Sequence, residues 1–186
     1  MSSLVLSTER LTLRPIAKTD AELLWPHVSD PEISQDMSWE AHQHLSETQE
    51  FIDSTLKSME QGRTITWCIF LDGEFCGLFS LIAILKKHRA LTYNRAELAY
   101  WAARAFQGKG IMTEAGLKVV EFAFTELGLN KLVVGHHDNN RNSEALILRL
   151  GFHYHYTEEE VFMKNGSWIT CKFYELKAKE YLKNSH

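Results

Sequence analysis

A strand, a glycine-containing turn and a helix follow one another in the second half of the chain, and this succession constrains the fold most. Arg95–Ala102 is rich in β-prone and apolar residues and predicts a strand. Gly108 and Gly110 come next in a short turn. From Ile111 to Leu127, apolar side chains recur three or four residues apart, which predicts an amphipathic helix. The succession indicates an α/β protein whose helix begins beside the end of a strand.

The turn before this helix has the features of an anion site. Backbone N–H groups in the first turn of a helix have no partner within the helix, and they lie at the positive end of its dipole. The amides from Gln107 to Met112 therefore suit a pyrophosphate, and Lys109 adds a positive charge. Two glycines one residue apart are equally compatible with an ordinary turn, because the full GxGxxG, GKS and GKT patterns of nucleotide sites are absent.

Periodic patterns predict the other elements. Runs of alternating or continuous apolar residues predict strands at Thr8–Arg14, Thr64–Leu71, Glu74–Leu85, Lys131–Gly135, Phe152–Glu160 and Trp168–Leu176. Helices are predicted from Thr19 or Asp20 to His27, from the cap Ser46 to Gly62, and over Ser143–Leu150 with Asn142 or Ser143 as the cap. Asp72-Gly73 and Asn165-Gly166 predict hairpin turns. Together these elements predict one mixed-sheet α/β domain over residues 1–186.

Composition and charge argue against a nucleic-acid-binding, a secreted or a membrane-spanning protein. The 186 residues have a formal net charge of -4, and the 20 Lys and Arg residues are scattered along the sequence, so nucleic acid is not an expected partner. The apolar run Leu4–Leu6 is too short for a signal peptide, and no stretch is long enough to cross a membrane. We therefore expect a cytoplasmic protein with no membrane partner.

Cysteine and histidine residues do not form a recognisable metal site. Cys68, Cys76 and Cys171 lack zinc-type spacing, so we interpret them as reduced, buried thiols. A cysteine nucleophile with a base beside it in space stays open. His136 and His137 are neighbours on a predicted strand and would point to opposite faces, so no metal is expected.

Aromatic side chains are candidates for the core. Trp39, Trp67, Trp101 and Trp168 are expected there. On the strand that begins at residue 152, Phe152, Tyr154 and Tyr156 share one face, which we expect to face the core. His153 and His155 would then lie on the solvent side of the same strand.

Four segments of the chain are similar to one enzyme superfamily. Gln107–Ala115 (QGKGIMTEA) resembles the acetyl-CoA pyrophosphate loop of the GNAT superfamily of N-acetyltransferases. Thr8–Pro15 (TERLTLRP), Ala96–Trp101 (AELAYW) and Asn139–Phe152 (NNRNSEALILRLGF) resemble its RimJ/RimL-like branch in the same order. The resemblance covers nearly the whole chain, and the four ordered segments are specific together where each alone is not.

The resemblance implies a fold and an activity. The fold would be a single GNAT-type domain with a mixed, mostly antiparallel sheet flanked by helices. The activity would be direct transfer of an acetyl group from acetyl-CoA, without a metal, to a primary amine, either a protein N-terminal α-amine or a small-molecule amine. The protein would be a monomer or a homodimer. The segment around Trp39 would contribute to the acceptor pocket.

The resemblance also implies where acetyl-CoA binds. It would lie in a V between Ala96–Trp101 and Lys131–Gly135, with backbone donors of the first strand polarising the thioester carbonyl. The expected cofactor contacts are Ala99, Tyr100, Trp101, Gln107, Gly108, Lys109, Gly110, Ile111, Met112, Asn140 and Ser143. Ala105 stands where the family often has Gln or Arg, and we expect Arg104 beside it to compensate.

The reaction needs a group that accepts a proton, because an amine must be neutral to attack. A free α-amino group has a pKa of about 8 and a lysine side chain one of about 10.4. Glu97 is our first candidate, since related enzymes often have an acidic residue at this position. Glu160, in the acidic cluster Glu158–Glu160, is the second candidate. Ser143 is expected near the departing sulfur, and it also suits a helix cap.

Two other functions are compatible with the sequence. A noncatalytic acyl-CoA-binding sensor would keep the glycine turn, but substitution of the carboxylates would change no turnover. A metal-dependent hydrolase would use the histidines, and the purified protein would then contain stoichiometric metal.

Overall fold

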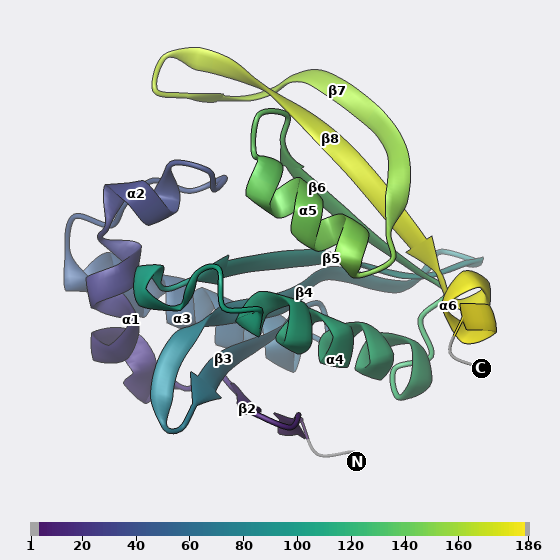
Figure 1. Ribbon diagram of the computed structural model, residues 1–186, viewed down its shortest axis with the longest axis horizontal. Coiled ribbons are helices and arrows are strands. Elements are labelled where there is room, and N and C mark those ends of the chain that lie inside the picture. The colour runs from purple at the N-terminus through teal and green to yellow at the C-terminus, as the bar shows by residue number, and fades with distance from the viewer. Residues whose placement is uncertain (1–3, 185–186) are drawn as a thin grey trace.

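One sheet of eight strands organises the molecule (Figure 1). The computed structural model describes residues 4–184. The strands are β1 (Leu6–Ser7), β2 (Leu11–Pro15), β3 (Ile65–Leu71), β4 (Glu74–His88), β5 (Leu91–Ala102), β6 (Lys131–His137), β7 (His153–Lys164) and β8 (Ser167–Lys177). Their spatial order is β1-β2-β3-β4-β5-β6-β8-β7, and β5 and β6 are the one parallel pair of neighbours within the described residues. The expected mixed, mostly antiparallel sheet is confirmed.

Helices cover both faces of this sheet. They are α1 (Ala21–Val28), α2 (Pro31–Ser34), α3 (Leu45–Glu60), α4 (Ile111–Thr125), α5 (Arg141–Arg149) and α6 (Ala178–Asn184). The larger core cluster lies between the sheet and helices α4 and α5, and the smaller one lies between the sheet and α1, α2 and α3. Strand β5 contributes to both, because successive side chains point to opposite faces: Leu98 packs in the larger cluster and Trp101 in the smaller.

Strands β5 and β6 separate near their C-terminal ends. Their parallel pairing runs from Arg95–Lys131 to Leu98–Val134 and stops there. Beyond this point β5 stays paired with β4, and β6 stays paired with β8. Each strand is held by its outer neighbour, so the inner edges diverge and open a V in the middle of the sheet.

Two predicted hairpins are confirmed, and the positive φ angles fall where the turn chemistry requires them. Asp72 and Gly73 have φ angles of 51° and 84°, and Asn165 and Gly166 have φ angles of 49° and 75°. A two-residue turn with both φ angles positive matches the twist of the strands that it joins.

The predicted helix caps were wrong in detail, because other groups compete for the capping side chains. Asp20 does not cap α1, since its carboxylate accepts hydrogen bonds from the Arg14 guanidinium at 2.7 and 2.8 Å. Helix α3 begins one residue before Ser46, and the α5 cap is Asn140, whose Oδ1 accepts a hydrogen bond from the Ser143 N–H at 3.0 Å.

Of the aromatic residues expected to face the core, Phe152 is buried, but the prediction was wrong for Tyr154, Tyr156 and Trp168. Tyr154 and Trp168 are 54% and 55% exposed, and Tyr156 is also exposed. A register shift between Tyr154 and Tyr156 places the two rings on opposite faces of β7, against Tyr174 and Phe173 of β8, and β7 is the edge strand of the sheet (Figure 1). The three cysteines are free and buried, as predicted. Among residues 4–184, no helix has the length and apolarity needed to cross a membrane.

Candidate functional site

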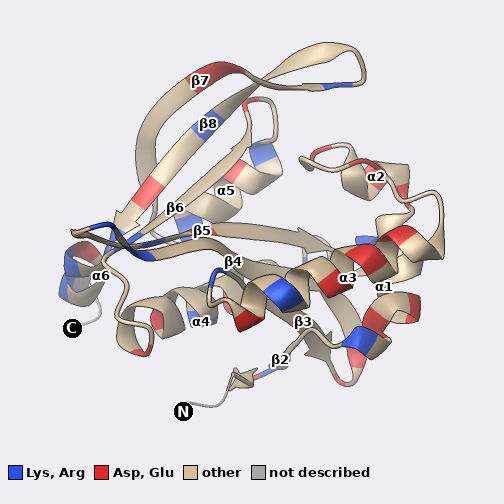
Figure 2. Ribbon diagram, turned by 180° about the vertical axis from the view of Figure 1, so that it is seen from behind, with Lys and Arg blue, Asp and Glu red and all other residues tan. Residues whose placement is uncertain are grey.

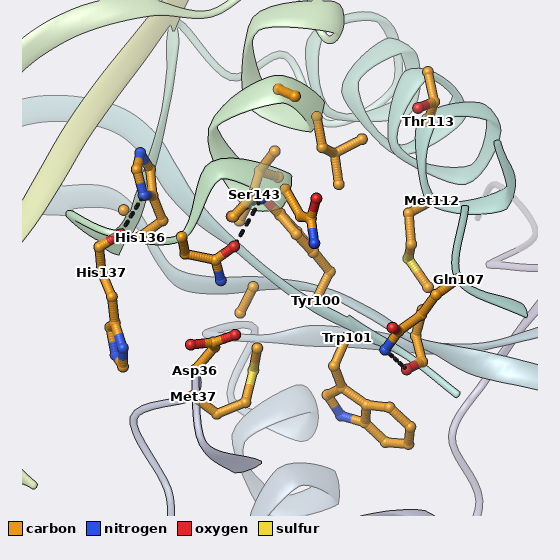
Figure 3. Close-up of a pocket in the computed structure, with 18 of the residues that line it drawn as sticks. Asp36, Met37, Tyr100, Trp101, Gln107, Met112, Thr113, His136, His137 and Ser143 are labelled. Atoms are coloured by element: carbon orange, nitrogen blue, oxygen red, sulfur yellow. Dashed lines mark hydrogen bonds between the residues drawn. The ribbon is translucent and has the colours of Figure 1, made fainter. Parts of the chain in front are cut away.

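A cleft of about 1260 Å³ occupies the V between β5 and β6. It is lined by both strands, the turn before α4, the first turns of α4 and α5, the segment after α2, and the β7–β8 hairpin. Figure 3 shows that Tyr100 and Ser143 lie on one side of β5, whereas Trp101, Asp36 and Met37 lie on the other. The sheet therefore divides the cleft into two halves that meet at the V.

The glycine turn forms one end of the cleft. Gly108 and Gly110 have φ angles of 72° and 75°, and Gly110 precedes the first residue of α4 in the left-handed conformation. This conformation directs the first amides of the helix toward the cleft, where they have no helical partner. The cleft-lining residues here include Gln107, Ile111 and Met112.

Two basic side chains near this turn are directed elsewhere. The Lys109 ammonium lies 5.3 Å from the centre of the Phe106 ring, and Lys109 does not line the cleft. Arg104 forms ion pairs with Asp30, at 3.4 Å, and with Glu32. The expectation that Arg104 compensates for the missing loop side chain is therefore not supported, because its guanidinium connects the turn to α2.

Arg10, which precedes β2, lies beside the turn. Arg10 forms an ion pair with Glu114 of α4 at 2.6 Å, and Thr8 donates a hydrogen bond to the same carboxylate at 2.5 Å. Burial opposes the charged form of Glu114, but the hydrogen bonds from Thr8 and Arg10 outweigh it and lower the pKa of this carboxyl. The cluster fixes the start of β2 against the first turn of α4. No pattern in the sequence indicates this arrangement.

We expect Gly110→Val to weaken acetyl-CoA binding by about tenfold or more, because a β-branched residue is strained at this φ angle and would reorient the loop amides. The measurement is isothermal titration with acetyl-CoA. Gly128→Val is the matched control, since Gly128 has a φ angle of 63° and lies just beyond the other end of α4. Equal binding by the two variants would show that the turn has a structural role only.

A pair of hydroxyl groups lies at the start of α5. The Tyr100 and Ser143 hydroxyl oxygens are 2.8 Å apart (Figure 3). Burial raises the pKa of Tyr100 to about 12, and the hydrogen bond with Ser143 offsets part of this effect. Tyr100 therefore keeps its proton at neutral pH and can share it with Ser143, which lines the cleft. The predicted contact Asn140 also lines the cleft, with its Oδ1 occupied by the helix cap.

The two candidate carboxylates lie in different environments. Glu97 lines the cleft, and burial raises its pKa, while the charge of Arg95 lowers it in part. Glu160 is exposed and does not line the cleft. It lies in an irregular part of β7, with a φ angle of 52°. The structure thus brings Glu97, and not Glu160, to the site.

Histidine residues at the end of β6 also line the cleft. The His136 ring donates from Nδ1 to the His137 carbonyl at 2.6 Å, and its Nε2 lies 3.4 Å from the Tyr174 hydroxyl. Burial lowers the pKa of His137, and the charge of Asp36 opposes this effect. Within residues 4–184, no group of three or more ligating side chains suits a metal.

Sequence reasoning did not assign three residues to the half of the cleft that Trp101 faces. Asp36, Met37 and His137 line the cleft, but none belongs to a motif. The one signal was the position of Trp39 between two helices. Only the tertiary structure brings the segment after α2 to the end of β6.

Comparison with known proteins identifies the family. Residues 10–153 match the family profile of the acetyltransferase (GNAT) domain. YdaF of Bacillus subtilis (strain 168), named as a candidate ribosomal N-acetyltransferase, is 34% identical over 114 residues, which are 61% of this chain and 59% of YdaF. Spermidine N(1)-acetyltransferase of Escherichia coli (strain K12) is 28% identical over 164 residues, which are 87% of this chain and 83% of that enzyme.

A solved structure shows the same fold. RimL, a ribosomal alpha-N-protein acetyltransferase in complex with coenzyme A, superposes with a TM-score of 0.86 and covers 95% of this chain and 99% of its own. The two sequences are 19% identical, so the likeness concerns the fold.

Proposed function

Because the chain belongs to the GNAT acetyltransferase family, we propose that it transfers the acetyl group of acetyl-CoA to a primary amine by direct attack in a ternary complex. The observation that carries the proposal is the V between β5 and β6, with the glycine turn on one side and an acidic segment on the other. Acetyl-CoA supplies the acetyl group as a reactive thioester. Residues of this chain would bind the two substrates and accept the proton of the amine.

The half of the cleft that faces α4 and α5 suits acetyl-CoA. The amides of Gln107–Met112 would bind the pyrophosphate, and Asn140 would bind the pantetheine arm. Free backbone N–H groups of Ala99–Trp101 would polarise the thioester carbonyl. The Ser143 hydroxyl, held in place by Tyr100, would donate a hydrogen bond to the departing sulfur and stabilise its negative charge.

The opposite half of the cleft suits the amine. Glu97 would take the proton that the ammonium must lose, directly or through a water. Its partly buried carboxyl has a raised pKa, which makes it a stronger base than an exposed glutamate. Glu160 stays the second candidate, and a movement of the hairpin would be needed to bring it to the cleft.

The charge distribution favours a cationic acceptor. Residues 20–60 contain ten Asp and Glu residues but a single lysine and no arginine. Figure 2 shows acidic residues, in red, along the ribbons of α1, α2 and α3. Since Glu32 and Asp36 line the cleft, and α1, α2 and α3 cover the sheet face that carries Trp101, their field would raise the local concentration of an ammonium-bearing acceptor. Both a polyamine and a protein N-terminus meet this requirement.

We expect CoA release from acetyl-CoA in the presence of spermidine or of a peptide with a free N-terminus. The measurement is colorimetric detection of the free thiol, followed by mass spectrometry of the acceptor. The same peptide with a blocked N-terminus and no lysine is the control. Acetyl-CoA binding without turnover on any amine would favour the noncatalytic sensor. No binding of acetyl-CoA would reject both functions.

A further inference from the structure

A buried lysine connects the hairpin tip to the segment after α2. Lys164, the last residue of β7, is 6% exposed. Its ammonium donates hydrogen bonds to the carbonyl oxygens of Ser34, Met37 and Trp39 at 2.5, 2.6 and 2.9 Å. An ammonium has three N–H groups, so all of its donors are used.

A buried ammonium group lowers the stability of a protein unless all of its N–H groups have hydrogen-bond acceptors. Burying a cationic group takes it out of water, and the cost is offset only when its donors and the surrounding charges compensate. Burial lowers the pKa of Lys164, while the charges of Glu40 and Asp36 oppose this effect. One carbonyl belongs to Ser34, the last residue of α2, and the other two belong to the irregular segment that follows it, so the ammonium holds that segment against the end of the helix.

The two segments joined by Lys164 form opposite walls of the acceptor half. The segment after α2 contributes Asp36 and Met37 to the cleft, and the hairpin contributes Val161 and Phe162. The Phe162 ring lies 5.5 Å from the ring of His137 at the end of β6. Figure 1 and Figure 2 both show the hairpin tip reaching toward α2 across the molecule.

The wall next to Lys164 carries a carboxylate that is available to a ligand. Asp36 lines the cleft and is exposed, and within residues 4–184 its side chain has no hydrogen bond or ion pair. Its neighbour Met37 provides one of the carbonyls that hold the Lys164 ammonium. The position of the Asp36 backbone is therefore tied to Lys164 through the next peptide.

We propose that Lys164 is a positioning residue for the acceptor: it holds the segment after α2 against the hairpin, so that Asp36 binds the acceptor ammonium. This role rests on the proposed acetyl transfer. It assigns Asp36 to substrate binding and gives Lys164 no contact with substrate. Lys164 therefore acts on acceptor affinity and not on acetyl-CoA.

The main test is a double-mutant cycle of Lys164→Met and Asp36→Asn, assayed with spermidine. Each single variant is expected to raise the acceptor KM by about tenfold, with kcat and the Kd of acetyl-CoA changed by less than about threefold. If Lys164 acts through Asp36, the double variant will resemble the single variants, because coupled residues are not additive. Effects on KM that multiply, or an unchanged KM in Lys164→Met, would overturn the proposal.

A second readout does not depend on turnover. Hydrogen exchange of residues 34–40 is expected to be at least about tenfold faster in Lys164→Met, with α4 and β5 unchanged. Lys172→Met is the matched control, since Lys172 lies on the partner strand of the same hairpin and does not line the cleft. Leu129→Ala controls for a general loss of stability, because Leu129 is buried in the larger core cluster.

The outcomes separate this role from the proposed function. No turnover by the wild type with spermidine or with a peptide that has a free N-terminus would reject acetyl transfer and, with it, the acceptor role of Lys164. Turnover with unchanged exchange in residues 34–40 of Lys164→Met would reject the role of Lys164 alone. If Lys164→Met does not fold, Lys164→Gln carries the same comparison, because its amide keeps two donors. An acceptor KM at the wild-type value in Lys164→Gln, with residues 34–40 exchanging faster, would also reject the role.

Discussion

Glu97→Gln is expected to lower kcat by about 10²- to 10⁴-fold, the usual contribution of a general base, while acetyl-CoA binding stays near that of the wild type. The reason is that Glu97 lies on the acceptor face of the sheet, where a rigid strand fixes its carboxylate. The measurement is the steady-state rate of CoA release at saturating acetyl-CoA. Glu160→Gln is the control and should behave like the wild type.

The pH dependence gives this prediction a second signature. Burial raises the pKa of Glu97, so the wild-type kcat/KM should rise with pH through a pKa above that of an ordinary glutamate. This acidic limb should disappear in Glu97→Gln, and higher pH should restore part of the rate by deprotonating the acceptor. A silent Glu97→Gln together with an inactive Glu160→Gln would assign the base to the hairpin.

Glu97 should also lower stability at neutral pH. A carboxyl whose pKa is higher in the folded state binds its proton more tightly there, so its contribution to stability is present at low pH and is lost as the pH rises through the folded-state pKa. Glu97→Gln removes this loss, so the variant should melt at a higher temperature than the wild type at neutral pH. Such an exchange of stability for activity is typical of active-site residues.

Gly77→Ala is expected to lower the free energy of unfolding by about 2–5 kcal/mol. Gly77 has a φ angle of 147°, and a Cβ at this position would lie 2.2 Å from the Trp101 carbonyl oxygen and 2.9 Å from the Met112 side chain. The backbone oxygen cannot move without breaking the pairing of β4 with β5. The measurement is urea unfolding followed by circular dichroism.

The loss of stability expected for Gly77→Ala has two causes, the strain of a positive φ angle and the clash of the added Cβ. Gly62→Ala separates them. Gly62 has a φ angle of 69°, and a Cβ at this position would have no neighbouring atom within 4 Å. Its substitution should cost only the strain of the positive φ angle, about 1 kcal/mol. If both variants lost the same free energy of unfolding, the close approach of β4 to β5 would not be the reason that position 77 requires glycine.

The sequence predicted the elements best where one local rule decides the structure. The hairpin at Asp72 and Gly73 was predicted because few dipeptides tolerate two positive φ angles. The helix after Gly110 was predicted by its apolar period. Caps were predicted less well, because Asp20 had a stronger partner in Arg14 that local spacing does not reveal.

The two halves of the candidate site also differ in how well the sequence predicts them. The acetyl-CoA half depends on contiguous segments, so the positions around Gly108 and Ser143 could be found from motifs and from resemblance. The acceptor half depends on contacts between distant segments. Lys164 lies 127 residues from Met37 in the sequence, and no pattern connects a lysine in a hairpin to a loop before α3. Residue type alone predicts an exposed lysine at this position, since buried lysines are rare.

The divergence of β5 and β6 gives the sheet two open edges in its interior. Along the inner edges of 99–102 and 135–137, the strands lack a ladder partner within the described residues. Open strand edges ordinarily invite pairing with another molecule and aggregation. Here both edges line the cleft, together with residues of α5 and of the β7–β8 hairpin. The protein can therefore present backbone hydrogen-bonding groups to a ligand inside the cleft.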